Sequence, residues 1–464
     1  MKDALLIRRV EVRDRIVDVL VLDGRVAAMG DRLPPPRGAH VVDGNGGALL
    51  AGLHDHHVHL LAMAAAPRSI DASQLDQHAF VEALRAADRG NAEAAWLRVT
   101  GYHESVNGPL DRATLDGIVP DRPVRVQHAT GAMWVCNSAG LHAAQVSLAP
   151  PQGVERDVDG VMTGRLYALD EWLARVLPRE PVDLEPVGRD LTDFGVTGVT
   201  DMTPYRDARD LRVLRDAVST GTPAQRVVIT GAPALDRSDV APLVCGPAKI
   251  VVDDIRSPDL DGLAGEIAHA HALLLPVALH CASRLGVVLA LAALEAGGSF
   301  RGDRIEHGAV IPPELFARLH ALGVTVVTQP AFVHTRGDRY LSDVEPCDVP
   351  HLWRCKSLLD ANIAVAFGSD APYGPADPWV AIRAATTRRT RAGRAVGTGE
   401  RLAGRDALAR FLTPWHDPGG APRRVEPGTP ADLCLLHEPL AEALRDPTSD
   451  AVRATIIDGS LRGS

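Results

Sequence analysis

The middle of the chain alternates between short apolar runs rich in β-branched residues and longer stretches in which apolar residues recur with a helical period. Strands and helices that alternate roughly every 30 residues are typical of βαβ units, in which neighbouring strands run parallel. The pattern predicts a parallel α/β fold, and by itself it allows either an open, doubly wound sheet or a closed barrel. The strand-like runs are 195–200, 226–230, 250–252 and 324–328, and the helical stretches include 259–275 and 285–296.

Both ends of the chain show a different pattern, with short strands separated by tight turns. Near the start, Asp23-Gly24 lies between two apolar runs, which is the signature of a two-residue β-hairpin. The last 40 residues again read as turns and short strands. Because the two ends of a domain often lie close together, we predict one composite β domain from residues 1–50 and 420–464. Residues 51–419 are the predicted α/β domain, with an insertion within residues 60–190, where the alternation is weaker.

Composition narrows the class of protein. The chain has 464 residues, of which 46% are hydrophobic and only 4% aromatic, so we expect a globular protein with an aliphatic core. The formal net charge of −10 provides no basic footprint for nucleic acid or an anionic membrane. The six cysteines show no paired spacing, and neither a secretory signal nor a membrane-spanning run is evident. We expect a cytoplasmic protein without nucleic-acid or membrane partners; the oligomeric state, including a homo-oligomer, stays open.

Three His-x-His pairs stand out among the 18 histidines. They are His54/His56, His57/His59 and His269/His271. Residues two apart point to the same side of a strand but diverge on a helix, so only a pair on a strand can offer two imidazoles to one metal ion. The third pair lies in a helical pattern, which predicts a surface or packing role. The first two pairs share one strand and point to opposite faces, so only one of them can face a given site.

Four further polar residues stand at or near the edges of strand-like runs. They are Lys249, His280, His307 and Asp370. In parallel α/β folds the active site forms at the carboxyl ends of the strands, so we expect these side chains to meet there. A single buried histidine is more often part of a core than a ligand, but several at successive strand ends are a stronger signal. Imidazole and carboxylate groups together predict a site for a zinc-like divalent metal with room for water.

The order of these residues resembles the amidohydrolase superfamily and, within it, the branch called amidohydrolase family three. The run Gly52-Leu-His-Asp-His-His-Val-His-Leu60 is similar to the family motif PGFIDxHxH, with Ala51 in place of the usual proline. The segment Glu-Pro-Gly-Thr-Pro-Ala-Asp-Leu at 426–433 is similar to the family's return to its β domain. The resemblance implies a distorted (β/α)8 TIM-like barrel with a small composite β-sandwich domain built from both termini.

The resemblance also implies roles for the candidate site. His57 and His59 match the ligands of the more buried metal ion, and His280 and His307 those of the more exposed one. Asp370 matches a residue that contacts the metal and moves protons, and Asp370 and His307 are the predicted catalytic residues. Lys249 matches a lysine that in many members takes up CO₂ and bridges two ions as a carbamate. The alternative for Lys249 is an ion pair with Asp253 or Asp254 beside a single ion. The expected cofactor is one or two divalent ions, with zinc as the first candidate.

Substrate contacts are expected on the loops that follow the strands. The candidates are Tyr102, His103, His128, Trp134, Gln329 and His334, with Tyr373 and Trp379 as further pocket walls. Each competes with the simpler interpretation that the residue packs or solvates a loop. One departure from the family is Ala132, which stands in place of a histidine in a segment similar to GHxxxxNS and puts in question a contact that relatives make there.

Together these residues predict a metal-dependent hydrolase that cleaves a non-peptide C–N bond by metal-activated hydroxide. The expected substrate is a small organic amide, formamide, urea, carbamate or lactam. A metal-dependent esterase, lactonase or phosphotriesterase on the same barrel is the alternative enzyme. A non-catalytic scaffold is a third interpretation, which the complete set of ligand types disfavours.

Overall fold

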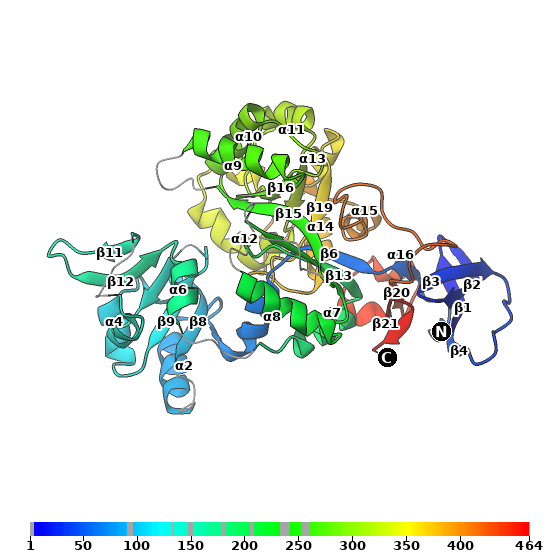
Figure 1. The fold of residues 1–464 in the computed structure, drawn as a ribbon, viewed down its shortest axis with the longest axis horizontal. Helices are drawn as coiled ribbons and strands as arrows, with labels where there is room; N and C mark the ends of the chain where they lie inside the picture. The colour runs from blue at the N-terminus through cyan, green and yellow to red at the C-terminus, as the bar shows by residue number, and fades with distance from the viewer. Residues whose placement is uncertain are drawn as a thin grey trace. The chain divides into compact units, whose positions relative to one another are not determined.

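The computed structural model of the protein describes residues 4–90, 96–131, 133–146, 152–177, 182–204, 208–232, 242–252 and 259–463. The chain divides into two compact units (Figure 1). The larger, here called the barrel unit, consists of Met1–Leu60 and Leu184–Ser464, and the smaller, the inserted unit, is Leu61–Asp183. No helix of the described residues is long and apolar enough to cross a bilayer.

An eight-stranded parallel sheet is the centre of the barrel unit, in the order β19-β18-β17-β16-β15-β14-β13-β6. Its strands are β6 (Leu53–Val58), β13 (Val196–Asp201), β14 (Arg226–Gly231), β15 (Val244–Val251), β16 (Val277–Cys281), β17 (Arg304–His307), β18 (Thr325–Thr328) and β19 (Val365–Phe367). The first and last strands meet through a parallel bridge between Val58 and Ala371. The Asp370 N–H also donates a 2.7 Å hydrogen bond to the His57 carbonyl. These contacts bring the two edges together, so the sheet is a barrel and not an open, doubly wound sheet.

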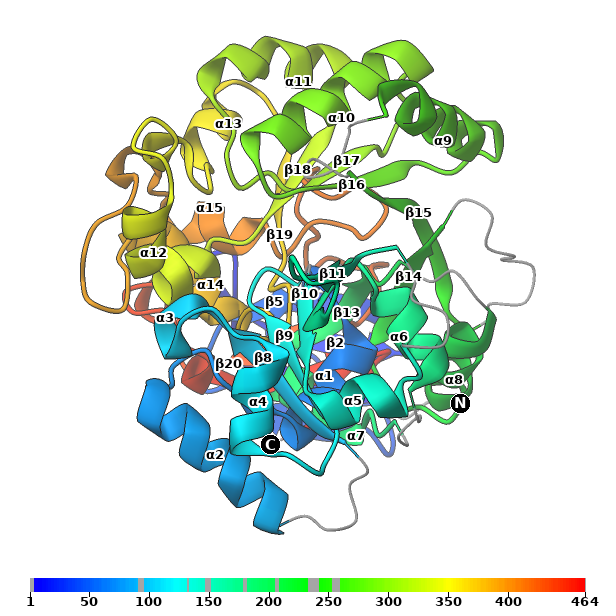
Figure 2. The same ribbon diagram turned by 90° about the vertical axis from the view of Figure 1, so that its left-hand side faces the viewer.

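Helices cover the outside of the barrel strands. They are α7 (Glu185–Asp193), α8 (Ala208–Ser219), α9 (Leu260–Ala272), α10 (Arg284–Gly297), α11 (Phe316–Leu322), α12 (Ala331–Asp343), α13 (Lys356–Asp360), α14 (Pro378–Thr387) and α15 (Gly404–Ala409). Figure 2 shows α9, α10 and α11 side by side outside β16 and β17. Capping residues fix where two of them start, because Gly262 N–H donates to Asp259 and Gly286 N–H to Ser283. His271 on α9 lies 3.0 Å from Asp303, in keeping with the packing role that the helical pattern predicts.

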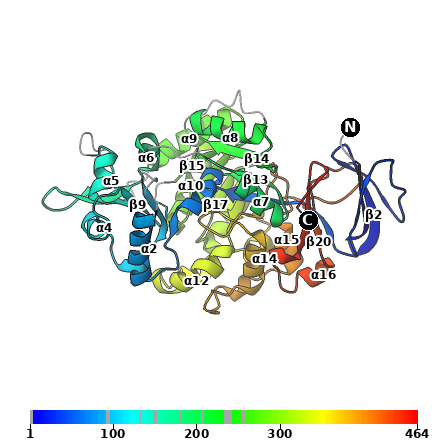
Figure 3. The same ribbon diagram turned by 90° about the horizontal axis from the view of Figure 1, so that it is seen from below.

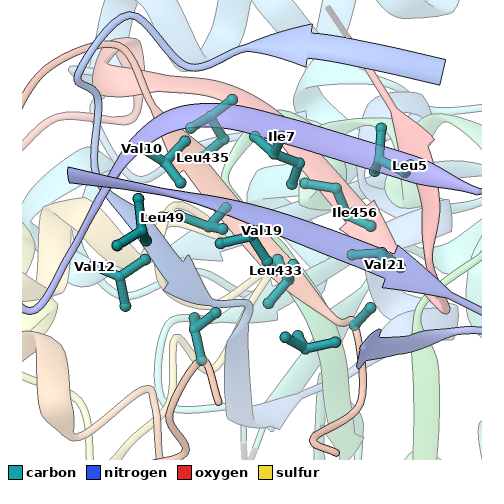
Figure 4. Packing of buried hydrophobic residues seen from close by; sticks show 14 of the residues in the cluster. Leu5, Ile7, Val10, Val12, Val19, Val21, Leu49, Leu433, Leu435 and Ile456 are labelled. Atoms are coloured by element: carbon teal, nitrogen blue, oxygen red, sulfur yellow. The ribbon is translucent and has the colours of Figure 1, made fainter. Parts of the chain in front are cut away.

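Two four-stranded sheets from the two ends of the chain pack against each other. One contains β1 (Leu5–Val12), β2 (Arg15–Leu22), β3 (Arg25–Gly30) and β4 (His40–Asp43); the other contains β5 (Leu49–Ala51), β20 (Leu433–Leu436), β21 (Val452–Ile457) and β22 (Ser460–Arg462). Figure 3 shows β2 and β20 in neighbouring sheets, and Figure 4 shows the shared aliphatic core, in which Ile7 and Val19 meet Leu433 and Ile456. The domain boundaries given above, 1–50 plus 420–464 and 51–419, stay a prediction.

The inserted unit has a sheet and a core of its own. The sheet order is β11-β12-β10-β9-β8-β7. The strands are β7 (Ile70–Asp71), β8 (Leu97–Tyr102), β9 (Val124–His128), β10 (Met133–Cys136), β11 (Val154–Arg156) and β12 (Met162–Tyr167), and the helices are α2 (Gln77–Gly90), α3 (Glu104–Asn107), α4 (Arg112–Ile118), α5 (Ser138–Ala143) and α6 (Asp170–Val176). Phe80, Leu84 and Leu115 are buried in one apolar cluster of this unit. The unit falls within residues 60–190, where the sequence predicts an insertion. Two short helices complete the set, α1 (Leu60–Ala65) and α16 (Leu440–Ala443).

Candidate metal centre

Strand β6 presents two histidine pairs to opposite sides. His57 lies near the carboxyl end of this strand, and His59 follows directly after the strand. His54 and His56 point the other way, and the Nε2 atom of each lies beside a threonine hydroxyl. Those partners are Thr200 at 2.9 Å and Thr413 at 2.8 Å. One pair is therefore bound into the packing around the strand, and only the pair His57/His59 faces the candidate centre.

Three potential ligand atoms converge at the end of β6. Asp370 Oδ1 lies 3.4 Å from His57 Nε2 and 3.2 Å from His59 Nε2. His57 is fully buried and Asp370 nearly so, and neither His57 Nε2 nor Asp370 Oδ1 has a hydrogen-bond partner among the described residues. Buried polar atoms are nearly always partnered in native proteins. Two nitrogens and a carboxylate oxygen in this arrangement fit a divalent cation.

The backbone around Asp370 holds its carboxylate in place. Asp370 has φ 57° and His307 has φ 69°, a left-handed conformation that is uncommon for residues other than glycine and that clusters at functional sites. Asp55 accepts from the backbone N–H groups of His57 and Ser369, each at 3.0 Å, and so ties the first strand to the segment after the last. Burial raises the pKa of this Asp55 carboxyl to about 7.

Hydrogen bonds on the far side of the rings decide which nitrogen of each histidine has a free lone pair. The Nδ1 atoms of the rings lie beside acceptors: His57 beside Glu306 Oε2 at 2.5 Å, His307 beside Gln329 Oε1 at 2.9 Å, and His59 beside the Thr203 hydroxyl at 3.2 Å. A carboxylate or amide oxygen only accepts, so Nδ1 of His57 and of His307 carries the proton. Their Nε2 atoms therefore present lone pairs, which metal ligation requires.

A second pair of ring nitrogens meets beside the first group. His307 Nε2 and His280 Nδ1 are 3.1 Å apart, and the ring centroids of His57 and His307 are 4.8 Å apart. The two nitrogens either share one hydrogen bond or turn two lone pairs toward a cation. Burial lowers the pKa of His280 to about 3 and lowers the pKa of His57 and His307 well below the usual value. All three rings are consequently neutral at pH 7, as metal ligands must be.

Lys249 lies on β15 and faces the same centre. Its side chain is buried, and its Nζ has no hydrogen-bond partner among the described residues. Burial is the main cause that lowers the pKa of His57, His280 and His307, and the positive charge of Lys249 lowers it further. Burial lowers the pKa of Lys249 itself. Asp253 and Asp254, its alternative partners, lie outside the described residues.

The structure also brings in Glu306, which the sequence analysis does not single out. Glu306 and Arg304 stand two apart on β17, both fully buried, and the Arg304 Nε–H donates to Glu306 Oε1. Strands that are buried on both faces of a parallel sheet usually read as continuous apolar runs. A charged pair inside the run Arg-Ile-Glu-His was therefore a signal that the sequence offered.

Two predicted residues of the substrate pocket in the barrel unit, Gln329 and Trp379, are buried. Gln329 is fully buried, and its amide oxygen accepts from His307, so it holds a histidine of the centre and does not line an open pocket. Trp379 is also fully buried and donates its indole N–H to the Phe194 carbonyl at 3.1 Å, so it belongs to the core. A polar or aromatic residue after a strand looks the same in sequence whichever way it packs.

Two further candidates of the barrel unit are His334, which lies on α12, and Tyr373, which lies beside His59. His334 on α12 has its Nδ1 3.3 Å from the Arg389 carbonyl. Tyr373 packs edge-on against His59, with ring centroids 5.5 Å apart. Tyr373 is thus placed at the centre itself, while a substrate contact by His334 stays a prediction.

Tyr102 and Trp134, two predicted substrate contacts, pack within the inserted unit. Both are buried; the Tyr102 hydroxyl donates to the Gly108 carbonyl at 2.7 Å, and the Trp134 indole donates to Asp170 at 2.7 Å. Burial raises the pKa of Tyr102 to about 12. Their hydrogen-bonding groups are thus used within the unit. Ala132, the departure from the family pattern, lies outside the described residues.

His103, Glu104 and His128 form a second cluster, in the inserted unit, with ligand atoms within 4.8 Å of one another. Its hydrogen bonds do not fit a metal ion. The Nδ1 atoms of His103 and His128 accept from the backbone N–H groups of Ser105 and Thr130, each at 3.2 Å. Each neutral ring must then carry its proton on Nε2. The two Nε2–H groups face the Glu104 carboxylate, at 3.7 and 3.1 Å, and leave no lone pair for a metal.

Comparison with known proteins supplies the family. The model of the amidohydrolase family matches residues 40–461. The chain belongs to this family. An N-substituted formamide deformylase from Arthrobacter pascens is 26% identical over 536 residues, covering 100% of this chain and 98% of the relative. The expected family is confirmed, and so is the expectation of an enzyme of the amidohydrolase type.

Solved structures share the fold. An uncharacterized metal-dependent hydrolase from Pyrococcus horikoshii OT3 matches with a TM-score of 0.71 at 20% identity, covering 97% of this chain and 99% of that one. The atrazine chlorohydrolase TrzN from Arthrobacter aurescens TC1, complexed with zinc, matches with a TM-score of 0.55 at 15% identity, covering 99% and 95%. The predicted TIM-like barrel of an amidohydrolase is thereby confirmed.

Proposed function

We propose that this amidohydrolase is a metal-dependent hydrolase that cleaves a non-peptide C–N bond of a small organic molecule. The observation that carries the proposal is the convergence of His57 Nε2 and His59 Nε2 on Asp370 Oδ1, with the His57 lone pair fixed by Glu306. The relative named as a deformylase acts, by its name, on N-substituted formamides. N-substituted formamides and related amides are therefore the first substrate class to test.

The residues divide into two groups of ligands. His57, His59 and Asp370 would hold one divalent ion, and His280 with His307 would hold a second. A set rich in imidazole nitrogen suits zinc, with other transition metals able to take its place. When bound by these residues, a divalent ion would supply Lewis-acid chemistry: it would lower the pKa of a coordinated water toward about 7 and would polarise the substrate carbonyl.

Asp370 is the residue that would move the proton. Its carboxylate is 9% exposed, so it is within reach of a molecule at the open side of the centre. As a carboxylate it takes a proton from the attacking water, and as the acid it returns that proton to the leaving nitrogen. The Asp370 backbone N–H donates to the His57 carbonyl, and this hydrogen bond helps to keep Oδ1 beside both ligand nitrogens. His307 is the second proposed catalytic residue, because its neutral ring stands beside the same centre.

Lys249 would become a bridging ligand in this proposal. Burial favours the neutral amine, whose nitrogen has a free lone pair. That nitrogen would add to the carbon of CO₂ and then lose one proton, which gives an anionic carbamate. Two carbamate oxygens would then supply the negative charge that two ions among neutral histidines need. The unmodified amine beside a single ion is the alternative that the sequence also allows.

The test compares matched substrates on the zinc-reloaded protein after chelation. We expect zinc to bind and to restore release of the amine and formate from N-substituted formamides. Turnover of the isosteric formate esters alone would replace the amidase interpretation by the esterase one. A folded chain that neither binds zinc nor turns over any of these compounds would support the scaffold interpretation.

A further inference from the structure

Glu306 has both carboxylate oxygens engaged by groups from different parts of the barrel. Oε2 accepts from His57 Nδ1 at 2.5 Å, and Oε1 accepts from Arg304 Nε. The side chain is fully buried. His57 belongs to β6 and Glu306 to β17, so this hydrogen bond crosses the interior between strands that are not neighbours in the sheet.

Arg304 holds the Glu306 carboxylate in one orientation. The guanidinium donates from Nη2 to the His56 carbonyl at 2.6 Å, one residue before the histidine that Glu306 contacts. Arg304 is 2% exposed, so its charge is compensated inside the protein and not by solvent. The chain of contacts runs from the backbone of β6 through Arg304 and Glu306 and back to the His57 ring. These three hydrogen bonds start and end on the same strand, and together they fix the orientation of the His57 ring.

A carboxylate on Nδ1 changes what the opposite nitrogen can do. It fixes the tautomer in which Nε2 has the lone pair, and its negative charge increases the electron density that Nε2 donates to a cation. His59 and His307 have weaker partners on Nδ1, since Thr203 and Gln329 are both neutral. Of these three rings, only that of His57 is backed by a carboxylate.

We infer that Glu306, held by Arg304, is a positioning residue that sets the metal affinity of the centre through His57. This inference rests on the proposed function, because it needs a cation at His57. It assigns the charged pair of β17 to the site and not to the stability of the barrel. Pairs of this kind contribute little to stability, since burying two charges costs about as much as their attraction returns.

The decisive variant is Glu306→Gln in the full chain. We expect its affinity for zinc, measured by competition with a chromophoric chelator, to fall about 10- to 100-fold. The absorption spectrum of the cobalt-substituted protein should change as well, because the field of the His57 nitrogen on the ion is weaker. Since this variant leaves Arg304 buried without a counter-charge, the double variant Arg304→Met/Glu306→Gln removes both charges. It should restore folding stability without restoring zinc affinity.

A second buried arginine–glutamate pair provides the control. Arg354 and Glu400 are 8% and 6% exposed and 2.9 Å apart, and neither contacts a ligand candidate. Arg354→Met/Glu400→Gln should leave zinc affinity and the cobalt spectrum unchanged. Wild-type zinc affinity in both Glu306 variants would overturn the inference alone, as would an equal loss in the control pair. A folded wild-type chain that binds no zinc would overturn the proposed function and the inference together.

Discussion

The two histidine pairs of β6 form a matched comparison at the scale of single residues. His57→Ala removes a ligand nitrogen, and we expect zinc binding and turnover to fall by several orders of magnitude while the fold persists. His54→Gln removes an imidazole of the same strand whose partner is Thr200, so it should cost about 1 kcal/mol of stability and leave zinc bound. Metal content per chain and chemical denaturation check both variants. Zinc retained at full affinity in His57→Ala would contradict the assigned centre.

The ligand candidates could be predicted from the sequence, but the contacts made by the residues that orient them could not. His280, His307 and Asp370 can be recognised because each stands at the edge of a strand-like run and strand ends meet in a parallel fold. Glu306 is 249 residues away from His57 in sequence, and their contact exists only because the barrel brings two strands face to face across its interior. Gln329 is the opposite case, a residue expected to contact substrate that instead lies buried behind His307. A buried amide in that position has the same local sequence context as one that faces a ligand.

Closure of the barrel depends on how near β19 comes to β6, and Gly368 sits at that approach. A Cβ on Gly368 would lie 2.5 Å from His57 Cβ and 2.8 Å from its backbone nitrogen. We expect Gly368→Ala to lose about 1–3 kcal/mol of stability, by overpacking, and to weaken zinc binding by displacing His57. Gly399→Ala is the control, because a Cβ there meets nothing within 4 Å. Equal unfolding midpoints for the two variants in urea would argue against close contact at the seam.

Element boundaries follow the local pattern except where Gly and Pro interrupt it. The hairpin at Asp23-Gly24 is found as expected, with φ of 47° and 76° at the two turn residues. The predicted run 250–252 captures only the end of β15 (Val244–Val251), whose first half contains Gly246 and Pro247, two residues that are uncommon inside strands. In the barrel, tertiary packing keeps that segment extended. Local propensity alone therefore underestimates strands that begin with such residues.

At the scale of the whole molecule, periodicity predicts parallel strands and helices but not closure. An open sheet and a barrel have the same alternation, and the difference lies in a few contacts between β6 and the segment after β19. Those contacts join residues more than 300 positions apart, such as Asp55 and Ser369 at a separation of 314. The family motifs around His57 and Asp370 supplied the prediction of a closed barrel, because they imply a fold in which the first and the last strand both contribute ligands.

Buried neutral histidines should make the folded state sensitive to acid. Burial lowers the pKa of His54 and His56 well below the value of about 6.5 that an unfolded chain has. Below pH 6.5 the unfolded chain binds protons at these histidines and the folded chain does not. The free energy of unfolding is therefore highest above this pH and decreases as the pH falls. Each such histidine should add a slope of about 1.4 kcal/mol per pH unit to the free energy of unfolding. Urea denaturation of the chelated protein between pH 7.5 and 5 measures this slope, and His54→Gln should reduce it by the share of one histidine. Asp55, whose raised pKa contributes a slope of the opposite sign, is common to both proteins, so equal slopes in the wild type and His54→Gln would mean that the His54 ring is protonated in the folded state.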